Sequence, residues 1–373
     1  MHDRQMQDRL LYAAAARFES ARTLSQLPQG HRARRLHGHG FVASVRAAIA
    51  PGWADFPGSE VDQLRARLQH CVAPLDYQLL NECLEQPTDE NLARWVRAHL
   101  DLPSIEQVGV QSTPVQGADV DRQERAYAWR RYRFEAAHRL PNVAPDHKCR
   151  RMHGHGFEVI LHAAAATGRH ESGADSGLLC DRLDRCWAPI HAEFHQACLN
   201  DIPGLENPTS ELIASTIWRR LKPLLPELSR VTVSETATCG AHFDGRRYRI
   251  WSELSLDSAV RMRRAPEADS RRRIHGHTYG LRLHLSASLD EVLGWTIDFG
   301  DVKERFKPAF IRLDHQPLYE LPAIEDNDAA TLARWIKQQV VADLPELDRV
   351  DLLETRGCGA ILMWGRDDAT LPV

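Results

Sequence analysis

The alternation of hydrophobic and polar residues is clearest in the last third of the chain. Between Gly280 and Leu285 the apolar residues alternate with polar ones, as in a strand with one buried face. Asp328 precedes a helical pattern and has the side chain of a helix N-cap. The predicted elements are strands at 249–258 and 274–287, helices at 300–312 and 328–341, and strands at 349–355 and 360–364. Together they form a β-β-α-α-β-β unit.

This unit occurs three times. The tripeptide His-Gly-His stands at 37–39, 153–155 and 275–277, each copy after a basic pair, and the copies are 116 and 122 residues apart. Thr88 and Thr209 match Asp328 as helix starts, and each follows a proline. We predict repeats over residues 1–118, 119–247 and 248–373, with linkers near 114–121 and 243–247.

The composition narrows the class of protein. The chain of 373 residues has a net charge of −4 and is 43% hydrophobic, so we expect neither nucleic acid nor an anionic membrane as a partner. Its eight cysteines form no C-x-x-C pair, which favours a reducing compartment. No secretion signal and no apolar run long enough to span a bilayer is visible. We therefore expect a cytoplasmic protein.

The second repeat holds a candidate metal site. His153 and His155 are two residues apart on a predicted strand, so both imidazoles point to the same face. If the preceding strand forms a hairpin with this one, His138 at its end supplies a third nitrogen. Three histidines with an open fourth position are typical of catalytic zinc. The matching residues in the other repeats are Arg22 and Val260, which cannot bind Zn²⁺, so we expect one zinc ion per chain.

These residues belong to a longer series of motifs. The second repeat has F-x-A-A-H, C-x-x-x-H-G-H and P-T-x-E, and its strand ends in E-T; a glycine-to-D-F turn and L-D-H stand in the third. The series resembles the family of 6-pyruvoyl-tetrahydropterin synthase and 6-carboxytetrahydropterin synthase, over nearly the whole chain. The resemblance implies the α+β tunnelling fold, in which a four-stranded antiparallel sheet with two helices is the unit. Three tandem units would form a pseudo-trimeric twelve-stranded barrel, and two such chains would stack as a homodimer.

The resemblance also implies roles for residues of the second repeat. His138, His153 and His155 would bind zinc, and Cys149, four residues before His153, would be catalytic. We expect nearby Zn²⁺ and arginines to lower the pKa of this thiol. Glu235, followed by Thr236, would bind the substrate, since a carboxylate accepts two parallel hydrogen bonds from the amino-pyrimidine edge of a pterin. The positions that match Cys149 are Ala33 and Arg271.

The family's Asp-His pair for proton transfer is complete only in the third repeat, as Asp314 and His315. The other repeats have Leu75-Asp76-Tyr77 and Phe194-His195-Gln196 at that place. We therefore expect one composite active site, with the zinc ligands and Cys149 from repeat two and the Asp-His pair from repeat three. The first repeat would be structural, with Gln111 at the anchoring position. Glu354, without a complete metal site beside it, is interpreted as a strand-end carboxylate.

The resemblance implies a zinc-dependent lyase. The short gap after Cys149 favours the carboxytetrahydropterin branch, which converts 7,8-dihydroneopterin triphosphate to 6-carboxytetrahydropterin, acetaldehyde and triphosphate on the way to queuosine. Arg150, Arg151 and the run 271–273 are candidates for phosphate contact. Two alternatives stay open: a lyase of the 6-pyruvoyl type, and a pterin- or zinc-binding protein without turnover.

Overall fold

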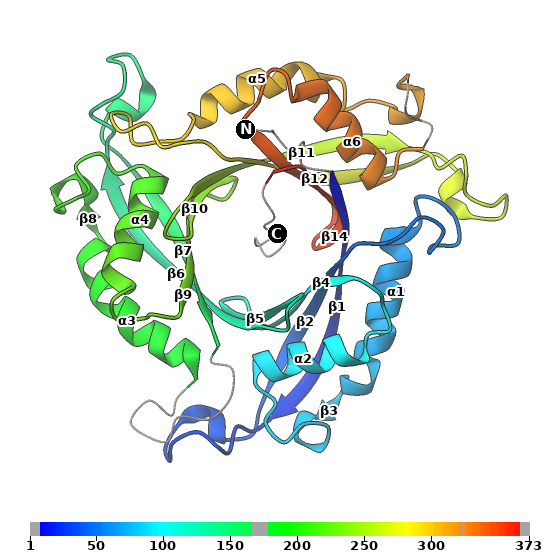
Figure 1. Ribbon diagram of the computed structural model, residues 1–373, viewed down its shortest axis with the longest axis horizontal. Coiled ribbons are helices and arrows are strands. Elements are labelled where there is room, and N and C mark those ends of the chain that lie inside the picture. The colour runs from blue at the N-terminus through cyan, green and yellow to red at the C-terminus, as the bar shows by residue number, and fades with distance from the viewer. Residues whose placement is uncertain (1–7, 166–177, 323, 325, 366–373) are drawn as a thin grey trace, which may run out of the picture.

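A closed barrel of twelve long antiparallel strands forms the centre of the computed structural model, and helices surround it (Figure 1). The structure describes residues 8–165, 178–322, 324 and 326–365. Neighbouring strands follow the order β14-β13-β12-β11-β10-β9-β7-β6-β5-β4-β2-β1, and β14 pairs with β1 to close the ring. Closure leaves the twelve-stranded ring without a free sheet edge. The predicted barrel of three tandem units is confirmed.

Each repeat contributes four long strands and two helices, in the predicted order. The first contains β1 (Arg9–Arg22), β2 (His37–Ala47), α1 (Glu60–Val72), α2 (Asp89–His99), β4 (Ile105–Thr113) and β5 (Gln116–Asp121). The second contains β6 (Ala126–His138), β7 (His153–Ala164), α3 (Leu179–Phe194), α4 (Ser210–Leu221), β9 (Leu228–Thr236) and β10 (Cys239–Phe243). The third contains β11 (Tyr248–Val260), β12 (His275–Leu285), α5 (Phe299–Ile311), α6 (Ala329–Val340), β13 (Leu347–Thr355) and β14 (Cys358–Met363). The two-residue strands β3 (Gln78–Leu79) and β8 (Ala197–Cys198) add parallel pairings to β1 and β6.

The predicted helix starts are present. The side chains of Thr88, Thr209 and Asp328 accept hydrogen bonds from backbone N–H groups in the first turns of α2, α4 and α6. The linker predicted near 114–121 is wrong, because most of it is the strand β5, which pairs with β4 and β6. The polar residues Asp119 and Asp121 make this segment look like a solvated loop in the sequence, but they lie on the strand. The first two repeats are joined instead by the turn at 122–125.

Strand alternation gives the barrel two different faces. On β7, Phe157, Val159 and Leu161 pack into the core beneath the helices. The residues between them therefore face the interior of the barrel, here called the tunnel. His153 and His155 have the same parity as Phe157 and therefore lie on the helix side of the sheet. The strands β1, β6 and β11 are parallel to one another, so the three His-Gly-His motifs lie at one end of the barrel. In the described part of the chain, no helix is long and apolar enough to cross a membrane.

Candidate metal and substrate site

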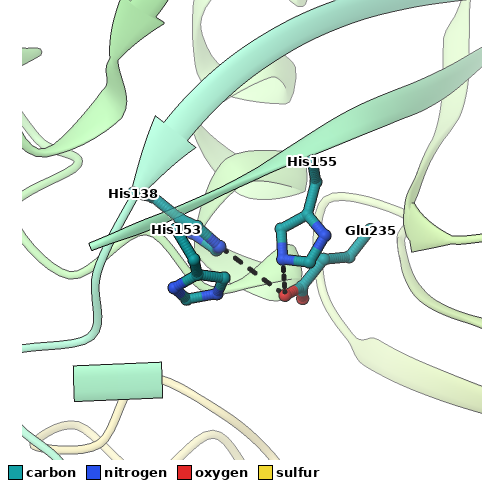
Figure 2. Close-up of side chains that lie close together, drawn as sticks. All are labelled: His138, His153, His155 and Glu235. Carbon is teal, nitrogen blue, oxygen red and sulfur yellow. Dashed lines mark ion pairs between the residues drawn. The ribbon is translucent and has the colours of Figure 1, made fainter. Parts of the chain in front are cut away.

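Three imidazoles of the second repeat converge at the end of the β6–β7 hairpin (Figure 2). His138 pairs directly with His153 across the two strands, and His155 follows two residues later on the same face. The ring centroids are 4.5 Å apart for His138 and His153 and 5.1 Å apart for His138 and His155. The hairpin expected from the sequence therefore brings the three predicted zinc ligands together.

Hydrogen bonds to the backbone orient two of the rings. Nδ1 of His138 lies 2.9 Å from the carbonyl oxygen of Pro208, and Nδ1 of His153 lies 2.7 Å from that of Arg151. Each Nδ1 can donate its hydrogen to the carbonyl oxygen. Nε2 then carries no hydrogen, and its lone pair faces the cluster. A carbonyl that fixes the tautomer in this way is the usual outer partner of a metal-bound histidine.

Glu235 completes the cluster, a contact that the sequence did not predict. Its Oε1 lies 3.0 Å from Nε2 of His155 and 3.6 Å from Nε2 of His138, while Oε2 accepts a hydrogen bond from Ser210. Burial alone would raise the pKa of Glu235, but hydrogen bonding and charge from the two histidines lower it below the ordinary value. Glu235 therefore borders the candidate metal position.

This donor set fits a zinc ion. One ligand atom from each of His138, His153, His155 and Glu235 lies within 4.8 Å of the others. The Nε2 atoms of His138 and His155 are buried and have no well-aligned hydrogen-bond partner. Burial of an unpaired imidazole nitrogen is unfavourable, and a shared cation removes that cost for several rings at once.

Cys149 lies beside this cluster, on the short 3₁₀ turn Lys148–Arg150. Its backbone N–H is oriented by Nδ1 of His147, and its side chain is half-buried. Burial, and then the negative charge of Glu235, raise the pKa of the Cys149 thiol, whereas Lys148 lowers it. The protein groups alone therefore do not produce the lowered pKa expected from the basic sequence around this cysteine.

The third repeat reaches this site through the segment that contains the glycine-to-D-F turn, whose contact with the second repeat the sequence did not predict. Residues 290–298, between β12 and α5, dock against the second repeat: Asn207 donates to the carbonyl of Leu293, and Thr209 to that of Gly294. Gly294 has a φ of +73°, and a Cβ there would lie 2.7 Å from a Leu212 methyl, so the close approach requires glycine.

A second buried carboxylate, Glu211, lies at this junction. It is 2% exposed, and its Oε1 accepts hydrogen bonds from the backbone N and from Oγ1 of Thr296, at 2.8 and 3.2 Å. Burial raises the pKa of Glu211 to about 7. The P-T-x-E motif contains this glutamate, so the signal was in the sequence, but its partner in another repeat was not.

Asp314 and His315 lie elsewhere. Among the described residues they gather with Asp257 of their own repeat, as a group separate from the histidine cluster. Asp314 accepts from Nδ1 of His315 at 2.9 Å and raises the pKa of this imidazole, whose side chain is 77% exposed. One chain thus does not bring the Asp-His pair to the predicted zinc ligands.

Thr236 is also apart from Glu235. It follows Glu235 on β9 and borders a cavity on the tunnel side of the sheet, and its Oγ1 lies 3.0 Å from the sulfur of Cys239. Consecutive residues of a strand face opposite sides, so the structure separates the two predicted substrate-binding residues.

In the first repeat an arginine stands where the second repeat has His138. Nη1 of Arg22 donates to the carbonyl of Pro87 and to Oδ1 of Asp89, both at 2.8 Å, and both side chains are buried. His138 uses the carbonyl of Pro208 in the same way in the second repeat. The guanidinium is therefore a fixed internal cation where the second repeat has a candidate metal position.

The pairing register corrects one assignment in this repeat. Gln111 pairs with Val42, as Ser234 pairs with Glu158, so Gln111 matches Ser234, and Ser112 matches Glu235. The hydroxyl of Ser112 donates to Asp89 at 2.6 Å. The prediction that Gln111 occupies the anchoring position is therefore wrong by one residue, and no carboxylate stands there.

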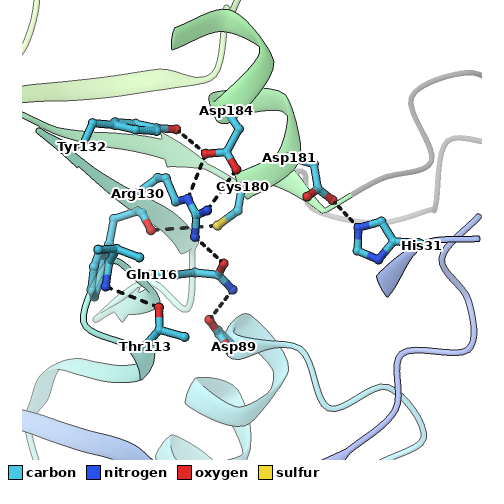
Figure 3. Close-up of polar contacts among 11 residues, drawn as sticks. His31, Asp89, Thr113, Gln116, Arg130, Tyr132, Cys180, Asp181 and Asp184 are labelled. Carbon is cyan, nitrogen blue, oxygen red and sulfur yellow. Dashed lines mark hydrogen bonds and ion pairs between the residues drawn. The ribbon is translucent and has the colours of Figure 1, made fainter. Parts of the chain in front are cut away.

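Polar side chains fill the junction between the first two repeats (Figure 3). Gln116 donates to Asp89 and accepts from Arg130, which binds both carboxylate oxygens of Asp184 at 2.9 and 3.0 Å. The cavity beside Arg22 has a volume of only about 10 Å³. The polar side chains at this junction therefore bind one another across the two repeats.

A family model described as 6-pyruvoyl tetrahydropterin synthase matches residues 12–123, 127–246 and 249–363. The chain belongs to the 6-pyruvoyl tetrahydropterin synthase family. One relative in this family, the 6-carboxy-5,6,7,8-tetrahydropterin synthase of Synechocystis sp., is 35% identical over 122 residues, which are 31% of this chain and 90% of the relative.

Solved structures align with parts of the chain at low sequence identity. The 6-pyruvoyl tetrahydropterin synthase of Caenorhabditis elegans aligns with a TM-score of 0.28 and 16% identity, over 30% of this chain and 92% of that one. Uricase from Arthrobacter globiformis aligns with a TM-score of 0.32 and 11% identity, over 60% of this chain and 80% of that one.

Proposed function

We propose that the protein is a zinc-dependent 6-carboxytetrahydropterin synthase with one active site per chain, in the second repeat. The observation that carries this proposal is the convergence of His138, His153 and His155 beside Cys149, with two buried nitrogens lacking well-aligned partners. The Synechocystis relative with that printed name, and the three-residue gap after Cys149, favour this branch of the family.

Each protein group has a distinct part in this proposal. Glu235 and Glu211 accept hydrogen bonds from the amino-pyrimidine edge of the pterin, and Thr296 holds Glu211 in place for that contact. Zn²⁺, when bound by the three histidines, supplies Lewis-acid polarisation of the substrate side-chain hydroxyls. Cys149, as the thiolate, accepts a proton from the substrate side chain, since it lies near Glu235 of the histidine cluster.

The Asp-His pair comes from a second chain in this proposal. The end of the barrel with the His-Gly-His motifs exposes an apolar residue at the same place in each repeat: Leu36, Met152 and Ile274 are 67%, 53% and 61% exposed. His315 lies near the same end, on the turn after α5, and its imidazole is exposed. Two chains stacked on these ends cover the apolar ring and bring His315 of each chain over the other.

A two-fold stack of this kind has one productive register. When repeat two of one chain faces repeat three of its partner, the symmetry places repeat one opposite repeat one. Each zinc site then faces the Asp314–His315 pair of the partner chain. Tyr77, the residue of the first repeat that matches His315, faces the Arg22 region of the partner's first repeat. Any other register leaves a zinc site opposite Tyr77 or Gln196, which cannot supply the same proton transfer.

Product analysis tests the proposed reaction. We expect the purified protein to contain about one zinc per chain, from the single complete ligand set, and to release acetaldehyde and triphosphate from 7,8-dihydroneopterin triphosphate. Cys149→Ala is expected to abolish release of acetaldehyde and to leave the zinc content unchanged. Retention of the three-carbon side chain in the product would indicate the 6-pyruvoyl reaction, and zinc without any product would indicate a binding protein.

A further inference from the structure

A second cavity lies inside the barrel, at the end opposite to the His-Gly-His motifs. β9 ends beside His155, and β10 runs back from it, so Phe243 and the turn at 244–247 lie at the far end. There a cavity of about 750 Å³ is bordered by tunnel-facing residues of several strands and by this turn. The catalytic site proposed above is on the helix side of the sheet and does not use this space.

Two buried histidines border this cavity. His162 on β7 and His242 on β10 are 5% and 4% exposed, and Nε2 of each has no hydrogen-bond partner. Nδ1 of His242 lies 2.8 Å from the hydroxyl of Thr232, which orients the ring. Burial, and then the positive charge of Arg230, lower the pKa of both histidines, so both rings are neutral. Each neutral ring can donate one N–H to a ligand.

Four arginines also line this cavity. Arg230 and Arg249 lie on the strands, and Arg246 and Arg247 are exposed on the turn at the mouth. Asp244 holds this turn, because its Oδ1 accepts the backbone N–H groups of Arg246 and Arg247. The turn therefore presents both guanidinium groups at the entrance.

The carboxylates around the cavity have partners of their own. Asp348 forms an ion pair with Arg249, and Asp119 lies near Arg46 and accepts a hydrogen bond from Gln107. A bound cation is not favoured either, since in the described part of the chain the candidate metal groups lie elsewhere. The cavity therefore combines positive charge with buried, unpaired imidazole nitrogens.

We propose that this cavity binds a multiply charged oxyanion of the phosphate class. Arg246 and Arg247 attract it at the mouth, and His162 and His242 donate hydrogen bonds to its oxygens inside the barrel. A cavity of this size accommodates a chain of several phosphate groups. The site is separate from the lyase reaction, so its test does not depend on the proposed function.

Isothermal titration of the full-length protein with inorganic tripolyphosphate, at constant ionic strength, tests the site. We expect a saturable site that is weakened at least about tenfold by Arg246→Ser/Arg247→Ser, which removes the positive charge at the mouth, and by His242→Asn, which removes a hydrogen bond to a charged oxygen. The turn variant changes only exposed side chains and keeps the fold intact. Inorganic phosphate, with fewer oxygens, is expected to bind more weakly at the same place.

A matched control removes the same charge elsewhere. Arg65 and Arg185 are exposed on α1 and α3, and Arg65→Ser/Arg185→Ser is expected to leave tripolyphosphate affinity unchanged. If both pairs weaken binding equally, the effect is one of net charge and the proposal is overturned. Binding that persists in the turn variant and in His242→Asn would place the anion at the catalytic site, and absence of binding would mean that only water fills the cavity.

Discussion

The carboxylate of Glu211 in the second repeat accepts a hydrogen bond from the backbone nitrogen of Thr296 in the third, at 2.8 Å. This bond fixes a buried carboxylate at the junction of the two repeats, beside Glu235. The junction is therefore part of the substrate site in the proposed function, although the residues that form it are not those expected from the L-D-H motif.

Glu211→Gln is expected to raise KM for dihydroneopterin triphosphate about tenfold or more, with a smaller effect on kcat. Above pH 7, where Glu211 is ionised, the charged acceptor for the pterin edge is lost, and such a bond contributes about 1.5–3 kcal/mol. Thr296→Val keeps the backbone bond and is expected to have a smaller effect on KM. Glu354→Gln is the matched control, since it changes a half-buried glutamate of the third repeat. Equal effects of the two Gln substitutions would show that Glu211 has no specific role in binding.

In the proposed scheme the third repeat has two of the three zinc-binding histidines and lacks only the one that matches His138. Val260 pairs with His275 across β11 and β12, as His138 pairs with His153. We expect Val260→His to raise the zinc content from about one to about two per chain, because three imidazoles then meet in a second place. Val260→Leu serves as the control for a change of side chain at this buried position. An unchanged metal content of a folded Val260→His variant would contradict this use of His275.

The ion pair of Arg22 with Asp89 is buried, so the loss of one partner is expected to be costly. Arg22→Ala should lower the free energy of unfolding by about 3 kcal/mol, because it leaves Asp89 with only the hydrogen bonds from Ser112 and Gln116. Urea denaturation measures this loss, and Arg65→Ala, at an exposed site, should change stability by less than about 0.5 kcal/mol. The zinc content should remain unchanged. A negligible loss of stability would mean that Arg22 does not substitute for a metal.

Glu354 predicts a pH dependence of stability. Burial, and then the charges of Asp62 and Asp328, raise its pKa from 4.5 to about 7 in the folded protein. Below pH 4.5 the carboxyl is protonated in both states. As the pH rises towards 7 and above, only the unfolded state ionises freely, so folding loses up to about 3 kcal/mol by pH 8.

Glu354→Gln cannot ionise and should escape this loss. The variant is expected to be more stable than the parent at pH 8 and nearly equal to it at pH 4.5, as measured by denaturation at several pH values. Glu211 adds a similar dependence to both proteins, so their difference isolates Glu354. A difference that does not grow with pH would show that Glu354 is ionised in the folded state.

The repeats, the strands and the three converging histidines could be predicted because they depend on local patterns. The spacing of His153 and His155 determines that they share a face, and a single hairpin brings in His138. The contact of Glu211 with Thr296 could not be predicted, since it requires the docking of two repeats. The error at Gln111 has another cause. Alignment of the repeats by sequence does not determine which residues pair across neighbouring strands, and a shift of one residue moves a side chain to the other face of the sheet.

The position of Asp314 and His315 is the part of the prediction that a second chain must complete, and mixed dimers test it. His138→Ala and His315→Ala chains are each expected to be inactive alone. If His315 acts on the partner's site, a dimer of the two variants has one site with intact histidines that meets an intact His315. Random exchange should then restore about a quarter of the parental activity, because half of the dimers are mixed and each has one working site.

A site built within one chain gives a different result. Each variant then carries its own defect, and mixing restores nothing. His37→Ala mixed with His315→Ala is the matched control: the first chain keeps both functional sets, so activity should already be present before mixing and should not change on exchange. Mass analysis shows whether the chains have exchanged. If they have exchanged and the mixture of His138→Ala and His315→Ala stays inactive, His315 does not act on substrate in the partner's site, and the stacked arrangement is wrong.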